Sequence, residues 1–347
     1  MMNLLFRHKT LLISLSLLLF LLIFSFYWLL FKPPSANSLT KIVNIKRGMN
    51  LKKISVVLEQ DGIIRNRHFF IGLATLLGKK GGIKAGEYEF HTGMLPLKVL
   101  DVIVKGQVKQ HLVTIAEGLT LLQIAEYLED LNIVGKEAFF LKASSPAFIA
   151  SLGFSPPFQG GRISTLEGYL FPDTYHLMKE MAPEEVIKMM VHQFKKVFGT
   201  ELQGRASELG ITQGEAVILA SIIEKETPLS EEKPLISAVL HNRLKKKMPL
   251  QSDPTVIYGI KNFDGNLTKV HLLHPTPYNT YLLSGFPPTP ICNPGKDSIL
   301  AALYPAPVAY LYFVSKNDGS HYFSSQIEEH NQAVWRYQKT KKNLTRK

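Results

Sequence analysis

Residues 43–70 read VNIKRGMNLKKISVVLEQDGIIRNRHFF, and residues 113–140 repeat the pattern as VTIAEGLTLLQIAEYLEDLNIVGKEAFF. At this shift of seventy residues, ten of the 28 aligned positions are identical, where chance would give roughly two. The identical pairs are Val43/Val113, Ile45/Ile115, Gly48/Gly118, Leu51/Leu121, Ile54/Ile124, Leu58/Leu128, Glu59/Glu129, Ile63/Ile133, Phe69/Phe139 and Phe70/Phe140. The sequence therefore predicts two copies of one structural unit.

Each copy has the pattern of a strand followed by helices. It begins with an alternating Val-x-Ile, which favours a short strand, and a turn follows at Gly48 or Gly118. Leu51, Ile54 and Leu58 then recur at helical spacing, as do their counterparts in the second copy. We expect strand, turn, helix and a second short helix around the Phe pair, in this order in both copies.

The segment between the copies continues the alternation of strands and helices. Residues 85–90 (AGEYEF) alternate like a strand, and Leu97, Leu100 and Ile103 have the spacing of a further helix. Region 41–150 is thus predicted to be α+β, and its pattern resembles LysM-like modules, small units that bind glycan chains. The alternative is a structural spacer that holds the last domain away from a membrane.

Upstream of the repeat, the run from Thr10 to Phe31 carries no charged residue. At ~1.5 Å per residue these 22 residues form a helix about as long as the hydrocarbon core of a bilayer. Tyr27 and Trp28 lie near its end, where aromatic rings suit the interface, and 33–34 (Pro-Pro) stops the helix. We predict a single uncleaved transmembrane helix over 10–31.

The flanking charges predict the orientation of this helix. Arg7 and Lys9 precede it, so the N-terminus is expected in the cytoplasm and the following residues outside, in the periplasm of a bacterium. The localisation predicted is therefore the inner (cell) membrane. A cleaved signal peptide is the alternative, but its apolar region is normally shorter, and Ser35-Ala36-Asn37 is a poor cleavage site.

Composition excludes several classes of protein. A chain of 347 residues, 46% hydrophobic and 20% charged, is long enough for two or three domains and too apolar for a disordered protein. The single cysteine, Cys292, excludes a disulfide-stapled scaffold and a Cys-rich zinc site.

Part of the formal net charge of +12 comes from a first basic cluster, which lies at the C-terminus. A second basic cluster is Arg243, Lys245, Lys246 and Lys247. No zinc-finger or RNA-binding signature accompanies these charges, so we expect a solvated tail over 339–347 and no nucleic-acid partner. Six basic residues lie in the last twelve positions: Arg336, Lys339, Lys341, Lys342, Arg346 and Lys347.

Common catalytic motifs are missing from the sequence. It contains no H-E-x-x-H, G-x-S-x-G, P-loop or G-x-G-x-x-G. His271 and His274 precede Pro275 and are expected in a loop, not at a metal. Ser230 and Lys233 fit S-x-x-K, but no K-T-G follows, so an acyl-serine enzyme is disfavoured.

One nearly apolar helix, GEAVILASIIEKET at 214–227, carries the candidate chemistry. Glu224 follows Val217, Ala220 and Ser221 at helical spacing, and a carboxyl beside such a small apolar stripe is expected to be desolvated. It would then act as a general acid near neutral pH. The alternative is a structural ion pair with a nearby Arg such as Arg243.

Glu226, two residues on, is expected to point elsewhere on the helix. We expect it to be solvated, or paired with Lys225 or Lys233.

The loops after this helix are rich in Tyr, Asn, Thr, Asp and His, which stack on sugars and bond their hydroxyls, although ordinary turns use many of the same residues. Together with the helix, they resemble the YceG-like family of endolytic murein transglycosylases over roughly 40–340. Phe286 and Thr289 depart from the usual residues of the family. The motifs that carry the resemblance are EGYLFPDTY (167–175), EKET (224–227), NRL (242–244), QSDPTVIYG (251–259), YNTY (278–281) and NPG (293–295).

The resemblance implies cleavage of the β-1,4 bond between N-acetylmuramic acid and N-acetylglucosamine inside a peptidoglycan strand. The C6 hydroxyl of the sugar attacks and leaves a 1,6-anhydro end, so one carboxyl suffices where ordinary glycosidases need two. Glu224 is the predicted catalytic residue, and Gln251, Asp253, Asn279 and Tyr281 are the predicted substrate-binding residues. No cofactor or metal is expected.

The resemblance further implies a role in terminating nascent glycan strands, with peptidoglycan synthases as partners. Two alternatives remain open at this level: a non-catalytic glycan-binding scaffold, and a hydrolase with Asp253 as the second carboxylate. The domains expected are a cytoplasmic N-terminus (1–9), a transmembrane helix (10–31), a linker (32–40), a LysM-like repeat region (41–150), a mixed α+β catalytic domain (160–338) and a basic tail (339–347).

Overall fold

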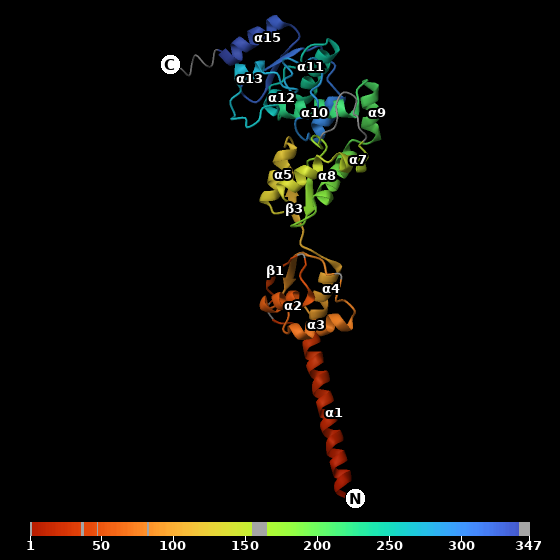
Figure 1. Cartoon of the computed structure of the whole chain (residues 1–347). Helices are drawn as coiled ribbons and strands as arrows, with labels where there is room; N and C mark the ends of the chain where they lie inside the picture. The colour runs from red at the N-terminus through yellow and green to blue at the C-terminus, as the bar shows by residue number, and fades with distance from the viewer. Residues whose placement is uncertain (1, 36–37, 47, 82, 155–164, 340–347) are drawn as a thin grey trace, which may run out of the picture. The chain divides into compact units, whose positions relative to one another are not determined.

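The computed structural model describes residues 2–35, 38–46, 48–81, 83–154 and 165–339 of the chain. The chain forms two compact units (Figure 1). Unit 1 contains residues 1–111 and 178–180, and unit 2 contains residues 112–177 and 181–347. The division falls between the two copies of the repeat. The expected start of the catalytic domain at 160, the Ala36-Asn37 part of the cleavage site that we considered, and the tail from 340 onward lie outside the described residues.

Unit 1 begins with the apolar helix α1 (Met2–Phe31), which starts eight residues before the uncharged run. Its segment Leu11–Trp28 is long and apolar enough to span a membrane, and its large apolar side chains are exposed. After α1 come β1 (Thr40–Ile45), α2 (Leu51–Gln60), α3 (Arg67–Leu76), β2 (Gly86–His91) and α4 (Pro96–Lys105).

The core of unit 1 lies between its strand pair and its helices. β1 and β2 are antiparallel, in a register running from Thr40 opposite His91 to Ile45 opposite Gly86. Alternate residues of both strands are buried with the apolar faces of the helices. The alternation over 85–90 and the helical spacing over 97–103 thus correctly predicted β2 and α4.

Unit 2 opens with the second copy of the repeat. β3 (His111–Thr114) spans the boundary between the units, and α5 (Leu121–Asp130) and α6 (Lys136–Ala143) follow it. The predicted order of strand, helix and helix is therefore confirmed in both copies. The first helix has a side-chain N-cap in each, Asn50 or Thr120, and the preceding Gly48 and Gly118 share positive φ angles of 83° and 76°.

After the second copy, α7 (Pro146–Ser151) leads to β4 (Thr174–Leu177), which pairs with β3, and to α8 (Pro183–Val197). A strand and a helix follow the two repeat helices in both units, so the similarity extends beyond the matched sequence. These elements and their order support the α+β class predicted from the sequence.

The rest of unit 2 surrounds one buried helix, α10 (Gln213–Glu226). Thr212 and Glu215 form a capping box at its start, and Pro228 follows its last turn. Residues 216–223 are all buried, so the helix forms the centre of the core. The neighbouring elements are α9 (Thr200–Glu208), α11 (Lys233–Lys245), α12 (Asp253–Tyr258), α13 (Lys269–Leu273), α14 (Lys296–Leu303), the antiparallel pair β5 (Tyr312–Ser315) and β6 (His321–Ser324), and α15 (Ile327–Val334).

Candidate functional site

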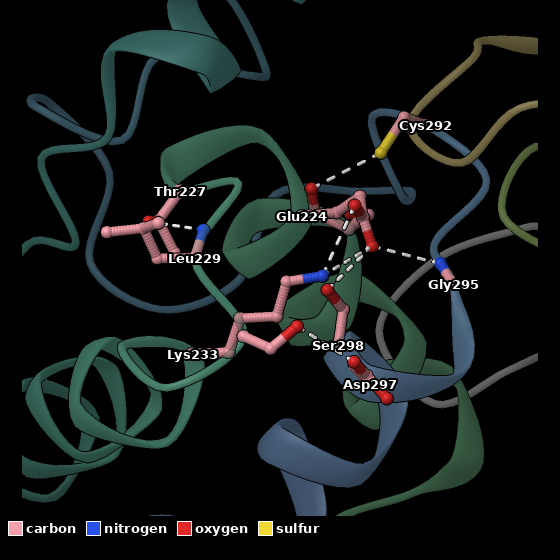
Figure 2. Close-up of polar contacts among 10 residues, drawn as sticks. Glu224, Thr227, Leu229, Lys233, Cys292, Gly295, Asp297 and Ser298 are labelled. Atoms are coloured by element: carbon pink, nitrogen blue, oxygen red, sulfur yellow. Dashed lines mark hydrogen bonds and ion pairs between the residues drawn. The ribbon is translucent and has the colours of Figure 1, made fainter. Parts of the chain in front are cut away.

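Two acidic residues lie in the last turn of α10, and they have different surroundings. Glu224 faces α14 and the loop before it (Figure 2). Glu226, about 200° around the helix, faces the segment before α12. The two carboxyl groups therefore belong to separate clusters.

Glu224 is held by groups of the protein itself. Its Oε2 accepts hydrogen bonds from the Gly295 amide at 3.0 Å and the Ser298 hydroxyl at 2.6 Å. The Lys233 ammonium lies 3.4 Å from both carboxylate oxygens (Figure 2). The side chains of Glu224 and Lys233 are only 9% and 5% exposed. The ion-pair partner of Glu224 is thus Lys233, at the start of α11, and not Arg243.

The small stripe that precedes Glu224 on α10 is also occupied. The Ser221 hydroxyl accepts a hydrogen bond from the Ile291 amide at 3.1 Å, and the Cys292 thiol lies 3.3 Å from the Ser221 carbonyl oxygen. The stripe therefore packs the chain's own 290–292 segment, because small side chains let a backbone approach closely.

Asn293 fixes the segment that donates to Glu224. It is fully buried, and its side-chain oxygen accepts hydrogen bonds from the amides of Gly168 and Leu170 at 3.0 and 2.9 Å. Its amide nitrogen donates to the Leu119 carbonyl and to Glu167, both at 3.0 Å. This residue of the NPG motif therefore joins the EGYLF segment to the second copy of the repeat.

Glu226 has the surroundings of a general acid. The Ser252 hydroxyl donates a hydrogen bond to it at 2.5 Å. Burial raises the pKa of Glu226 to about 7; the Ser252 hydrogen bond and the Arg243 charge oppose this shift, and the Asp253 charge adds to it. The prediction that Glu226 is solvated or paired with a lysine is wrong, because α10 ends against the 251–253 segment and Lys233 pairs with Glu224.

Three of the four predicted substrate-binding residues gather around Glu226. Gln251 and Asp253 are exposed and Tyr281 is partly exposed. The Tyr281 hydroxyl donates to Asp253 at 2.6 Å, and Arg243 donates to the Gln251 side chain at 3.1 Å. Burial raises the pKa of Tyr281, and the adjacent Asp253 and the charge of Glu226 act in the same direction.

Asn279, the fourth, is fully buried and lies behind this surface. Its amide donates to the carbonyls of Leu272 and His274 at 3.0 and 2.8 Å, and its oxygen accepts from the Tyr281 amide at 3.0 Å. In this conformation Asn279 shapes the turn that carries Tyr281.

Glu167, in the EGYLFPDTY motif, is a functional candidate that the sequence pattern alone does not single out. It is buried, and it accepts hydrogen bonds from the Leu121 amide, the Tyr258 hydroxyl and Asn293. Burial raises its pKa to about 7, against these hydrogen bonds. The signal available in the sequence was a glutamate inside the otherwise apolar run LEGYLF.

Glu117, in the turn of the second copy, is another acid near this network. A Cβ atom at Gly295 would overlap the Glu117 carboxyl, so the glycine of the NPG motif leaves room for this close approach. Burial raises the pKa of Glu117, the charge of Glu224 adds to the shift, and that of Lys233 opposes it.

The described residues contain no group of three His, Cys, Asp or Glu side chains that could hold a metal ion. His271 lies near the start of the short helix α13, where its ring accepts a hydrogen bond from the Thr268 amide in a capping box. This is a structural role, in a helix and not in the loop that we predicted.

Comparison with known proteins gives consistent matches over most of the chain. An endolytic murein transglycosylase of Bacillus subtilis is 31% identical over 318 residues, which cover 89% of this chain and 88% of that protein. One of Streptococcus pneumoniae is 29% identical over 337 residues, covering 90% of this chain and 61% of that protein. A crystal structure of a YceG-like protein from Listeria monocytogenes superposes with a TM-score of 0.59 at 31% identity, covering 85% and 99% of the two chains. The YceG-like family model matches residues 43–336, and the chain belongs to this family.

Proposed function

We propose that this chain is a membrane-anchored lytic transglycosylase. It cleaves the β-1,4 bond between N-acetylmuramic acid and N-acetylglucosamine inside peptidoglycan strands and leaves 1,6-anhydro ends. The observation that carries the proposal is Glu226, whose pKa is raised to about 7 beside exposed Gln251 and Asp253. The relatives named endolytic murein transglycosylases support the same reaction.

Glu226 acts first as an acid and then as a base. It donates its proton to the oxygen of the departing N-acetylglucosamine as the glycosidic bond breaks. The carboxylate formed then takes the proton of the C6 hydroxyl as that oxygen closes the 1,6-anhydro ring. One group with a pKa near the working pH serves both steps.

Glu224 has a positioning role in this proposal. Its oxygens accept from Gly295, Ser298 and Lys233, so it ties α14 and α11 to the end of α10. The sequence-based assignment of the acid to Glu224 stays a prediction that competes with this one, and variants of the two residues decide between them.

Substrate contacts come from the exposed surface around Glu226. Gln251, Asp253 and Tyr281 bond hydroxyl and acetamido groups of the glycan, and Asn279 supports Tyr281 from behind. The strand–helix units of the repeat region add LysM-like glycan binding.

Membrane anchoring by α1 places the enzyme beside newly made strands, with its N-terminus in the cytoplasm and unit 2 outside. Cleavage there terminates nascent strands next to the peptidoglycan synthases.

The mass of the product tests the reaction. Full-length protein in detergent is incubated with purified peptidoglycan, and the released ends are analysed by mass spectrometry. A 1,6-anhydro end is one water lighter than a reducing end. Reducing ends would instead support a hydrolase with Asp253 as the second carboxylate, and no product would support a glycan-binding scaffold.

A further inference from the structure

The positive charge of the chain is concentrated next to the apolar helix. Residues 32–111 contain 14 Lys and Arg against 5 Asp and Glu, a net charge of +9. Residues 112–347 contain 24 against 23, a net charge of +1, although this segment includes the basic tail. A domain that only spaces or binds uncharged glycan has no need of this asymmetry.

The rest of unit 1 packs directly on the C-terminal end of α1. The ring of Phe26 meets that of Phe69 on α3 edge-on, with centroids 5.5 Å apart. Arg65 donates two hydrogen bonds to the Pro33 carbonyl, at 2.7 and 3.0 Å, and Leu30 packs against the core of the unit. Figure 1 shows α3 lying across the C-terminal end of α1, which is where the headgroups of a spanned bilayer begin.

The end of α3 and the residues after it carry leucines and lysines that solvent reaches. Leu76 is seven residues after Phe69 and thus on the same face, and it is 74% exposed. Leu77 is also exposed, and after Gly78 come the partly exposed Lys79 and the exposed Lys80. Leucines flanked by basic residues are typical of segments that lie in the interface of an anionic membrane.

We propose that Arg65, Leu76, Leu77, Lys79 and Lys80, here called the α3 surface, dock on anionic lipid headgroups of the bilayer that α1 spans. The proposal rests on the membrane anchoring proposed above. The leucines enter the headgroup layer and the basic side chains meet lipid phosphates. Unit 1 then has a fixed orientation on the membrane instead of moving freely about the end of α1.

The test uses full-length protein with Leu76→Cys carrying an environment-sensitive fluorophore; native Cys292 is fully buried and does not compete for the label. The protein is reconstituted in phosphatidylcholine vesicles, with or without phosphatidylglycerol, that contain spin-labelled quencher lipid. We expect stronger quenching with phosphatidylglycerol, reversed by high salt. Lys79→Gln/Lys80→Gln should lower the ratio of docked to undocked unit by roughly fivefold for each lysine.

The matched control is Lys245→Gln/Lys246→Gln, which removes the same charge from exposed positions of unit 2 and should leave quenching unchanged. Vesicle flotation separates the two proposals. Protein that fails to float with either vesicle refutes the anchoring and the docking together. Protein that floats with both but is quenched equally, with or without phosphatidylglycerol, refutes the docking alone.

Discussion

The two copies of the repeat share their secondary structure but differ in what they contact. In the first copy Phe70 is buried and Phe69 packs against α1, whereas in the second Phe139 is buried and Phe140 is 37% exposed. Helix α6 also starts one residue earlier than the seventy-residue shift from α3 predicts. The same local pattern therefore presents different faces to different neighbours.

The turns before the first helices differ even more. In the second copy the Gly118 amide donates to the Asn293 carbonyl at 2.9 Å, and the Gly118 carbonyl accepts from Lys225 at 3.3 Å. At the corresponding Gly48, no atom of the described residues beyond its chain neighbours lies within 4 Å of the position of a Cβ. The second copy thus contacts the segments around the end of α10, and the first packs against α1.

The largest expected effect is on catalysis in unit 2. Glu226→Gln keeps the shape of the side chain but removes the proton donor, so turnover should fall by at least ~10²–10⁴-fold. Release of anhydro ends by folded protein is the measurement. Wild-type activity should also fall as the pH rises above about 7, where Glu226 loses its proton.

Glu224→Gln is the internal control for that variant. Nearly normal turnover by folded Glu226→Gln protein, together with a larger loss of turnover for Glu224→Gln, would show that Glu224 is the general acid.

The next effect is on stability. Glu224→Gln leaves the ammonium of Lys233 buried without its counter-charge, which should cost about 3 kcal/mol in the free energy of unfolding of unit 2. Denaturant unfolding at constant pH measures this loss. The double variant Glu224→Gln/Lys233→Met should recover part of it; a double variant no more stable than the single one would contradict the pairing.

The stabilities of the two units should change with pH in opposite directions. In unit 2 burial raises the pKa of Glu167 to about 7, so stability is full below the unfolded pKa and falls as pH rises through 7. The loss is on the order of 3 kcal/mol for a shift of this size. In unit 1 burial opposes the shift of Glu87, but hydrogen bonds from Lys179 and His111 lower its pKa, so this stability is lost as the pH falls.

Hydrogen exchange of core amides at about pH 3, about pH 5 and about pH 8 compares the two units in one sample: unit 2 should lose protection between about pH 5 and about pH 8, and unit 1 between about pH 5 and about pH 3. The raised pKa of Glu226 adds to the pH dependence of the stability of unit 2. The variant Glu167→Gln/Glu226→Gln should therefore make the stability of unit 2 less dependent on pH and leave the pH dependence of unit 1 unchanged. If the stabilities of both units changed with pH in the same direction, the roles given to Glu167 and Glu87 would be wrong.

The smallest expected effects come from substitutions at the glycines of the two repeat turns, Gly48 and Gly118. Gly48→Ala and Gly118→Ala both place a Cβ at positive φ, which should cost about 1 kcal/mol each. Only Gly118→Ala should also lower activity, because its turn contacts Asn293 and Lys225. Thermal melts and anhydro-end release together measure the two properties. Equal activity loss in both variants would mean that the first copy is also coupled to the site.

Sequence patterns were most successful where a single element carries the information. The apolar run predicts α1, the repeat predicts its strand and helices, and the alternation over 85–90 predicts β2. The helix before Pro228 is also predicted, and all of these elements lie at nearly the predicted positions. The repeat predicted Gly48 and Gly118 as turns because a conformation with positive φ favours glycine.

The site was harder to predict because helical spacing does not say what faces each side of the helix. Glu224 and Glu226 were correctly placed on different faces, but the small stripe that suggested room for a ligand packs Ile291 and Cys292 instead. The burial of Glu226 depends on Ser252, and the partner of Glu224 on the approach of α11.

The sequence by itself determined the apolar helix, the repeated strand–helix unit, the central helix with its two acids and the family motifs. These features depend on composition and on periods of two or 3.6 residues, which are local properties of the chain. Only the tertiary structure decided which acid is held by Lys233 and which has its pKa raised to about 7. It also decided that Glu167 and Asn293 join the second copy of the repeat to the site. Burial and hydrogen-bond partners come from segments far apart in the sequence, and the pKa of a carboxyl group depends on those neighbours.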